Sequence, residues 1–144
     1  MPFARALLGV LTAGLALTVA PTAANASVQF DYSFPNIQTG RCLDNNGTSL
    51  YTLPCNHGAN QTWYPTSDSR GLRSNGTNQC LDSNSAGRAY VLGCNGGAYQ
   101  QWVLERSGLI RNVATGLCLD SNHNGAAYTL PCNSGNRYQL WGRA

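Results

Sequence analysis

The chain repeats one pattern three times, and this internal repeat constrains the fold more than any other feature of the sequence. Each copy opens with Cys-Leu-Asp, and the opening cysteines lie 38 residues apart: Cys42, Cys80 and Cys118. Each copy closes with Gln-x-Trp, and the closing tryptophans lie 39 residues apart: Trp63, Trp102 and Trp141. A unit of about 40 residues is near the limit below which a chain needs partners to bury a core. We therefore expect the three copies to fold together into one body.

The first 26 residues have the composition of a secretory signal peptide. Arg5 supplies a basic start, an uncharged apolar stretch follows over residues 6–20, and Ala24-Asn25-Ala26 has the small-x-small pattern of a cleavage site. The apolar stretch is shorter than the ~20 residues that span a bilayer. We therefore expect residues 1–26 to be removed and residues 27–144 to be secreted, without insertion into a membrane.

The mature chain is expected to be a single domain of three repeats: residues 28–66, 67–105 and 106–144. No window of it places apolar residues at the i, i+3, i+4, i+7 spacing of a helix. Short runs rich in tyrosine, valine, leucine and threonine alternate instead with Asn-Gly, Ser-Gly and Gly-Gly turns. This pattern predicts an all-β fold with four short strands per repeat, closed into a threefold barrel.

The six cysteines fall two to a repeat. Six cysteines allow 15 connectivities, but each repeat has its own pair at nearly constant separation. Disulfides are favoured over free thiols in an exported protein. Each bridge would close a loop of about 15 residues and contribute roughly 3 kcal/mol. We expect three bridges within the repeats: Cys42–Cys55, Cys80–Cys94 and Cys118–Cys132.

The charge pattern argues against nucleic acid and anionic lipid as partners. Of the nine basic residues Arg5 belongs to the leader, so eight remain against six acids and the mature net charge is +2. These residues are all arginines and are scattered singly, without a polybasic run. The repeats contain neither Cys-x-x-Cys nor a calcium-type cluster of carboxylates, so we expect no metal and no cofactor.

The Gln-x-Trp motif is expected to be structural. Large aromatic residues at equivalent positions usually pack into a shared core, which we favour over stacking on a sugar. The glutamines have two possible roles that the sequence does not separate. They can tie the Trp-bearing strand to a neighbouring loop, or they can orient the aspartate of the repeat. The three glutamines are Gln61, Gln100 and Gln139.

One aspartate also recurs in each repeat: Asp44, Asp82 and Asp120. It can be an Asx-turn residue that closes a strand, helped by the asparagine two positions on. It can also accept charge-assisted hydrogen bonds from neighbouring sugar hydroxyls, which are roughly twice as strong as neutral ones. We favour the second role, with two further recurring types beside it. Tyrosines offer a ring face and a hydroxyl, and asparagines offer donors and acceptors: Tyr51, Tyr90, Tyr128, Asn56, Asn95 and Asn133.

The fuller motif, CLDSN-x-x-G-x-x-Y-x-L-x-C-N-x-G-x-Y-Q-x-W, resembles that of the ricin B-type lectins. Within that family it is most similar to the actinohivin-like lectins, which bind high-mannose glycans, and the match covers the whole mature chain. The resemblance implies a β-trefoil fold. Galactose- and xylan-binding modules of this type have a Gln four residues before the second cysteine and an aromatic residue two before it. Here tyrosine and leucine occupy those positions, as in the mannose-binding branch.

The resemblance implies three equivalent pockets for terminal, α1-2-linked mannose. The middle pocket is complete: Asp82, Tyr90, Leu92, Asn95 and Tyr99. The third has the same types, with one extra residue between its second cysteine and Gln139: Asp120, Tyr128, Leu130, Asn133 and Tyr138. The first has a shorter loop and an asparagine in place of the last tyrosine, and is expected to be weakest: Asp44, Tyr51, Leu53, Asn56 and Asn60.

These features favour a binding protein over an enzyme. A glycosidase needs two carboxyl groups roughly 5–10 Å apart, whereas the threefold relation places the recurring aspartates on separate lobes. The alternatives are a galactose- or xylan-type polysaccharide-binding module, and a trefoil that inhibits a protease through a protruding loop. We expect a monomeric lectin whose partners are glycans and glycoproteins rich in terminal mannose. Three sequons, at Asn46, Asn60 and Asn75, matter only in a source that glycosylates its secreted proteins.

Overall fold

The computed structural model describes residues 13–21 and 30–144, so the expected cleavage site lies outside the described residues. Residues 13–21 form no helix or strand, and their apolar side chains Leu15, Leu17 and Val19 are almost fully exposed. Within the described ranges, none of the helices has the length and apolar character needed to cross a bilayer.

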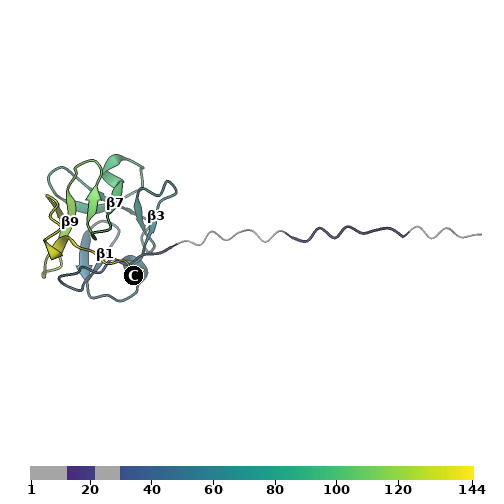
Figure 1. Cartoon of the computed structure of the whole chain (residues 1–144), viewed down its shortest axis with the longest axis horizontal. Helices are drawn as coiled ribbons and strands as arrows, with labels where there is room; N and C mark the ends of the chain where they lie inside the picture. The colour runs from purple at the N-terminus through teal and green to yellow at the C-terminus, as the bar shows by residue number, and fades with distance from the viewer. Residues whose placement is uncertain (1–12, 22–29) are drawn as a thin grey trace, which may run out of the picture.

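The remainder folds into short strands that are wound into one rounded body, with the chain entering it near its C-terminal end (Figure 1). This confirms the all-β prediction. In each repeat a single 3₁₀ turn ends at the glutamine of the Gln-x-Trp motif. The described elements are β1 (Cys42–Asn45), β2 (Leu50–Leu53), η1 (Ala59–Gln61), β3 (Trp63–Pro65), β4 (Leu72–Ser74), β5 (Cys80–Ser83), β6 (Ala89–Leu92), η2 (Ala98–Gln100), β7 (Trp102–Leu104), β8 (Ile110–Asn112), β9 (Cys118–Ser121), β10 (Ala127–Leu130) and η3 (Arg137–Gln139).

The strands form three similar antiparallel units. The strand orders β3-β4-β5-β6 and β7-β8-β9-β10 make two four-stranded sheets, and β1 and β2 make a hairpin. Isolated bridges supply the other two strands of the hairpin's unit, because Pro35 pairs with Cys42 and Asn36 pairs with Trp141. The start and the end of the folded chain therefore lie side by side and close the ring of repeats.

The three hairpins β1–β2, β5–β6 and β9–β10 join into a hairpin cap. Each hairpin accepts a backbone hydrogen bond from the next through the residues of its turn. Thr129 N donates to Gly87 O at 2.9 Å, and Thr52 N donates to Gly125 O at 2.8 Å. The third link is longer, from Val91 N to the carbonyl oxygen of Thr48 at 3.3 Å. The longer link belongs to the β1–β2 turn, which is one residue shorter than the other two.

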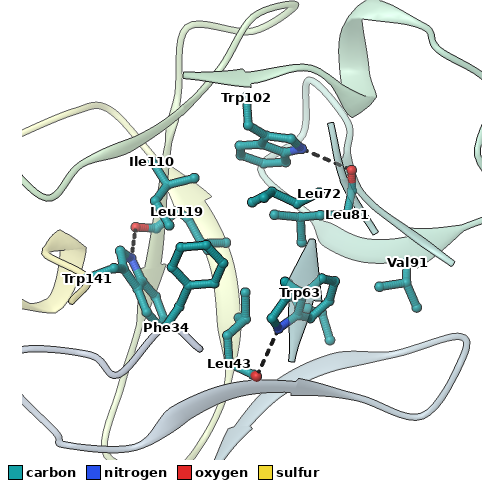
Figure 2. Close-up of a cluster of buried hydrophobic side chains, with 11 residues drawn as sticks. Phe34, Leu43, Trp63, Leu72, Leu81, Val91, Trp102, Ile110, Leu119 and Trp141 are labelled. Atoms are coloured by element: carbon teal, nitrogen blue, oxygen red, sulfur yellow. Dashed lines mark hydrogen bonds between the residues drawn. The ribbon is translucent and has the colours of Figure 1, made fainter. Parts of the chain in front are cut away.

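The core contains three layers, and each repeat contributes one residue to each layer (Figure 2). Two layers are aliphatic or aromatic residues 38 positions apart, and the third is formed by the buried tryptophans. Each indole Nε1–H donates to the carbonyl of the leucine in Cys-Leu-Asp, at 2.9–3.2 Å. The tryptophans are therefore core residues, as predicted. The layers are Phe34, Leu72 and Ile110; Leu43, Leu81 and Leu119; and Trp63, Trp102 and Trp141.

Three disulfides lie at equivalent places, each joining the inner strand of a hairpin to the loop that follows the hairpin. The Cα–Cα separation is 5.0 Å in all of them. The pairing is the one expected within repeats: Cys42–Cys55, Cys80–Cys94 and Cys118–Cys132.

Candidate functional site

The recurring aspartates lie within strands, and the Asx-turn interpretation does not describe them. Asp44, Asp82 and Asp120 are the third residues of β1, β5 and β9, and each is only 2–3% exposed. In the first two, Oδ1 accepts the N–H of the following residue at 2.7 Å. A carboxylate that is almost completely buried must be hydrogen-bonded, because burying it unpaired is costly. Its remaining partners therefore decide what it can do.

A glutamine of the same repeat supplies the second partner. In the middle repeat, Gln100 Nε2 donates to Asp82 Oδ2 at 2.9 Å and to Gly93 O at 2.9 Å. Gln100 Oε1 accepts the N–H of Asn95 at 2.8 Å. One buried amide thus ties down the loop after the hairpin and orients the carboxylate. The two roles that the sequence left open are both filled, and the same set of bonds recurs around Gln61 and Gln139.

Acceptor capacity remains on these carboxylates. An ionised carboxylate has about four lone-pair positions, and one bond to each oxygen is accounted for in Asp44 and Asp82. Burial raises the pKa of Asp120 above its usual value, and hydrogen bonds from Gln139 and the Ser121 N–H partly oppose this rise. In their ionised form these carboxylates can accept hydrogen bonds from the hydroxyl groups of a ligand.

A tyrosine lies directly across each hairpin from the aspartate. The paired residues are Asp44 with Tyr51, Asp82 with Tyr90, and Asp120 with Tyr128. Burial, and then the charge of the facing aspartate, raise the pKa of each of these tyrosines. They stay protonated at physiological pH and can act as hydrogen-bond donors. The hydroxyls of the second and third tyrosines donate to backbone carbonyls at 3.3 Å, which fixes the position of their rings.

The recurring asparagines combine turn chemistry with exposure. Asn95 is exposed, and its Oδ1 accepts the N–H of Gly97 at 2.8 Å in an Asx turn. Asn56 and Asn133 make the same bond, to Gly58 and Gly135 respectively. The acceptor of the amide is therefore engaged, and its Nδ2 donors are the groups it can offer a ligand. This is narrower than the donor-and-acceptor role predicted from the sequence.

The middle repeat brings four of its five predicted residues to one open cavity of about 220 Å³. Asp82, Tyr90, Asn95 and Tyr99 line it, together with Ser83, Gly97 and Asn84, for which the sequence predicted a role in a turn only. Asn84 recurs at the same place in each motif, so its repetition was the available signal. A charged acceptor, amide groups and two phenol rings therefore meet at one surface hollow, which we call the middle pocket.

The leucine predicted for the middle pocket, Leu92, does not line it. Leu92 is 50% exposed and faces a separate groove on the hairpin cap, while Leu53 and Leu130 are 40% and 45% exposed. They lie two residues beyond the pocket tyrosines on the same face of their strands, because side chains alternate across a strand. For the middle repeat, the prediction that the leucine lines the pocket is therefore wrong.

The third repeat keeps the last tyrosine of the motif, Tyr138, but its surroundings differ from those of Tyr99. Tyr138 is half-buried, and its backbone N–H donates to the side chain of Asn136, which caps η3. The ring of His123, from the β9–β10 turn, packs edge-on against that of Tyr138, with centroids 5.5 Å apart. The extra residue before Gln139 is thus accommodated at the N-terminus of η3, and His123 lies beside the ring of Tyr138.

The first repeat lacks this tyrosine. Asn60 occupies the place of the last tyrosine and contacts Gly76 of the next repeat. Its carbonyl accepts from Asn45 Nδ2 at 3.0 Å, and the same amide also donates to Ser74 Oγ at 2.9 Å. These residues join two repeats to each other, so this part of the first site has a structural task. The structure brings Asp44, Tyr51 and Gln61 together, and Asn60 supplies no ring at the position of Tyr99.

Among the described residues, no group of three or more histidine, cysteine or acidic side chains is placed to hold a metal ion.

A family model matches most of the chain. The ricin-type beta-trefoil lectin domain model aligns with residues 30–141, which include all three repeats. A search of curated protein sequences found no match.

Solved structures with the same fold support this alignment. A non-toxic homologue of type II RIPs from Momordica charantia (bitter gourd), in complex with α-methyl-D-galactoside, has a TM-score of 0.71 and 18% identity over 80% of this chain and 48% of its own. The agglutinin from Abrus precatorius has a TM-score of 0.70 and 23% identity over 83% and 48%. The C-half of an earthworm R-type lectin, in complex with GalNAc, has a TM-score of 0.66 and 17% identity over 78% and 96%. The chain spans about half the length of the first two proteins, and at these identities the likeness shows the fold alone.

Proposed function

The chain belongs to the ricin-type β-trefoil lectin family, and from that premise we propose that it is a lectin that binds terminal mannose, favouring α1-2-linked mannose of high-mannose glycans. The observation that carries the proposal is the middle pocket, where Asp82, Tyr90, Asn95 and Tyr99 meet at one cavity. Up to three equivalent pockets share the work, in the order middle, third, first.

The chemistry of the pocket supports a polyol ligand. A sugar presents neighbouring hydroxyls, and a buried, oriented carboxylate can accept two of them in charge-assisted bonds. The Nδ2 of Asn95 can donate to a sugar oxygen, and the rings of Tyr90 and Tyr99 can cover an apolar patch of the sugar. Gln100 holds Asp82 in place before the ligand arrives, so little side-chain entropy is lost on binding.

The choice of mannose rests on the sequence of the hairpin. Tyr-x-Leu-x-Cys-Asn occurs in all three repeats, as in the mannose-binding branch that the motif resembles. Galactose or GalNAc is the second candidate, because two of the structural neighbours were solved with such ligands. A xylan-type module and a protease inhibitor are weaker candidates, since the polar residues recur in pockets and the connecting loops are short.

Calorimetric titration of the mature protein with α1-2-mannobiose, methyl galactoside and GalNAc tests the proposal. We expect binding to mannobiose that EDTA does not abolish, and weaker or no binding to the other two. Binding to galactose or GalNAc alone would replace mannose with the second candidate. Failure to bind any of these sugars, or mannan on a column, would argue against a lectin of this specificity.

We also propose that the protein is secreted. The composition of residues 1–26 and the three disulfides support export to an oxidising compartment. N-terminal sequencing of the exported protein should begin at Ser27.

A further inference from the structure

We propose that a groove on the hairpin cap, next to the middle pocket, binds an anionic substituent of the glycan whose terminal sugar occupies that pocket. The groove, which we call the cap groove, has a volume of about 470 Å³ and is lined by residues of all three repeats. Its lining includes Thr48, Ser49, Arg88, Tyr90, Leu92 and Tyr128. The volume lies within the roughly 300–1,000 Å³ that is usual for ligand sites.

The cap groove and the middle pocket share a wall. Tyr90 lines both of them, so a ligand that extends past this ring passes from one to the other. Asp82 is on the pocket side of Tyr90 and does not line the groove. A saccharide can therefore place a neutral, hydroxyl-bearing residue against Asp82 and its next residue over the groove.

The cap groove is cationic. Arg88 is exposed and is the one charged residue among the groove's lining residues, beside the hydroxyls of Thr48 and Ser49. Across residues 13–21 and 30–144, the single ion pair joins Arg111 to Glu105, so no acid there neutralises Arg88. A guanidinium presents a planar set of donors that matches carboxylate and phosphate oxygens.

The fold does not require this side chain. Arg88 N donates to Asn84 Oδ1 at 3.1 Å, and in the third repeat Ala126 N donates to Asn122 Oδ1 at the same distance. An alanine thus performs the backbone role of Arg88 without any side chain beyond Cβ. The guanidinium is an addition that the middle repeat alone carries, because the equivalent residue of the first repeat is Ser49. We assign it to recognition of an acidic group.

The inference rests on the proposed function, and three ligands separate the two. Calorimetry would compare neutral α1-2-mannobiose with two anionic versions of it, in which the second residue carries a 6-phosphate or is a uronic acid. The phosphate and carboxylate versions identify which source of negative charge the groove prefers. The proteins are the wild type, Arg88→Ala, and Arg106→Ala as a matched control, since Arg106 is exposed and lies outside the groove's lining.

In the wild type we expect at least one anionic disaccharide to bind about fivefold more tightly than the neutral one at low salt, equivalent to ~1 kcal/mol. This ratio should fall to about one in Arg88→Ala, remain in Arg106→Ala, and shrink at high salt because of screening. A wild-type ratio of one, or a ratio that survives in Arg88→Ala, would overturn the inference while leaving the lectin function intact. If the neutral and anionic ligands all fail to bind, the proposed function fails and the inference fails with it.

Discussion

Gln100 Nε2 lies 2.9 Å from Asp82 Oδ2, and both side chains are almost completely buried. The same glutamine accepts the backbone N–H of Asn95, so one side chain positions the candidate anchor and the loop that faces it. Equivalent pairs join Gln61 to Asp44 and Gln139 to Asp120. The Gln-x-Trp motif therefore connects the core to the site, because its tryptophan packs inside while its glutamine arranges the surface.

Replacing Gln100 with glutamate should destabilise the protein through like-charge repulsion. The new carboxylate would face Asp82 in a buried setting, so we expect a loss of about 2–4 kcal/mol near neutral pH. The loss should shrink at acidic pH, where one of the pair is protonated. Urea unfolding at several pH values measures this effect. Gln101→Glu, at the half-buried neighbouring position, is the control and should lose much less.

The aspartate-to-asparagine series should rank the pockets. Asp82→Asn should weaken mannobiose binding most, Asp120→Asn less and Asp44→Asn least, with a loss of about 1–3 kcal/mol at the affected pocket. Circular dichroism must first show each variant folded, since an asparagine offers one acceptor to the two donors that the aspartate satisfies. If Asp82→Asn stays folded and the binding stoichiometry does not change, the carboxylate is structural only.

Asp120 should make stability depend on pH in an unusual direction. Its pKa is raised by burial, so the folded protein binds a proton more readily than the unfolded chain does. This carboxyl therefore destabilises the fold increasingly as pH rises from about 3.9, the unfolded value, through its raised folded pKa. Chemical unfolding from pH 3 to 7 should show the wild type losing stability relative to Asp120→Asn over that window. A difference between the two proteins that is constant with pH would contradict the assignment.

The disulfides should contribute separately and similarly. Each closes a loop of 13 or 14 residues in sequence separation. The paired variant Cys118→Ser/Cys132→Ser should therefore lose about 3 kcal/mol of unfolding free energy. The equivalent change at Cys80 and Cys94 provides the comparison. Non-reducing peptide mapping of the wild type should find only bridges within repeats, and a bridge between repeats would refute the pairing.

A buried polar pair is exchanged between repeats, which predicts a compensating double mutant. Where the first repeat meets the second, Asn45 donates to Ser74 Oγ. At the other two junctions between repeats, a serine stands at the position of Asn45 and an asparagine at the position of Ser74. At those junctions the asparagine Nδ2 donates at 2.8 Å to the carbonyl of Tyr99 or Tyr138, the equivalent of the Asn60 carbonyl that Asn45 reaches. Ser83 and Ser121 stand at the position of Asn45, and Asn112 and Asn36 stand at the position of Ser74.

Asn45→Ser alone should cost about 1–3 kcal/mol, because its amide makes four hydrogen bonds. Adding Ser74→Asn should recover much of the loss by restoring the arrangement of the other junctions. Thermal unfolding of the two single variants and the double variant gives the coupling energy. Simple additivity of the two single effects would show that the exchange is not compensating.

The repeat made most of the fold predictable. Its period placed the tryptophans at equivalent positions, and equivalent large aromatic residues in a small domain have one place to go, which is the common core. The same period selected one disulfide pairing from many. Both predictions are local consequences of repetition, because a residue and its two copies must occupy the same environment. The four-strand units followed from the alternation of short apolar runs with glycine turns.

The sequence was less informative about the pocket. It identified Asp82, Tyr90, Asn95 and Tyr99 as members, but it also placed Leu92 among them and gave Asn84 a role in a turn only. A motif orders residues along a strand, and the direction that each side chain takes depends on the twist of the hairpin and the turn beyond it. The sequence also predicted that Asn95 could accept hydrogen bonds from a ligand, but its Oδ1 already accepts the N–H of Gly97 in an Asx turn.

Residue type and spacing predicted the threefold architecture, the core and the disulfides, because these depend on features that recur in every copy. The sequence also showed that the copies differ in loop length and in the residue at position 60, but the contacts made by the differing residues became visible only in the folded molecule. Asn60 contacts Gly76 across a repeat boundary, His123 packs on Tyr138 in the third repeat, and Arg88 lines a groove to which all three repeats contribute. Each of these contacts depends on how loops and repeats lie against one another in space, and the order of residues along the chain does not specify that.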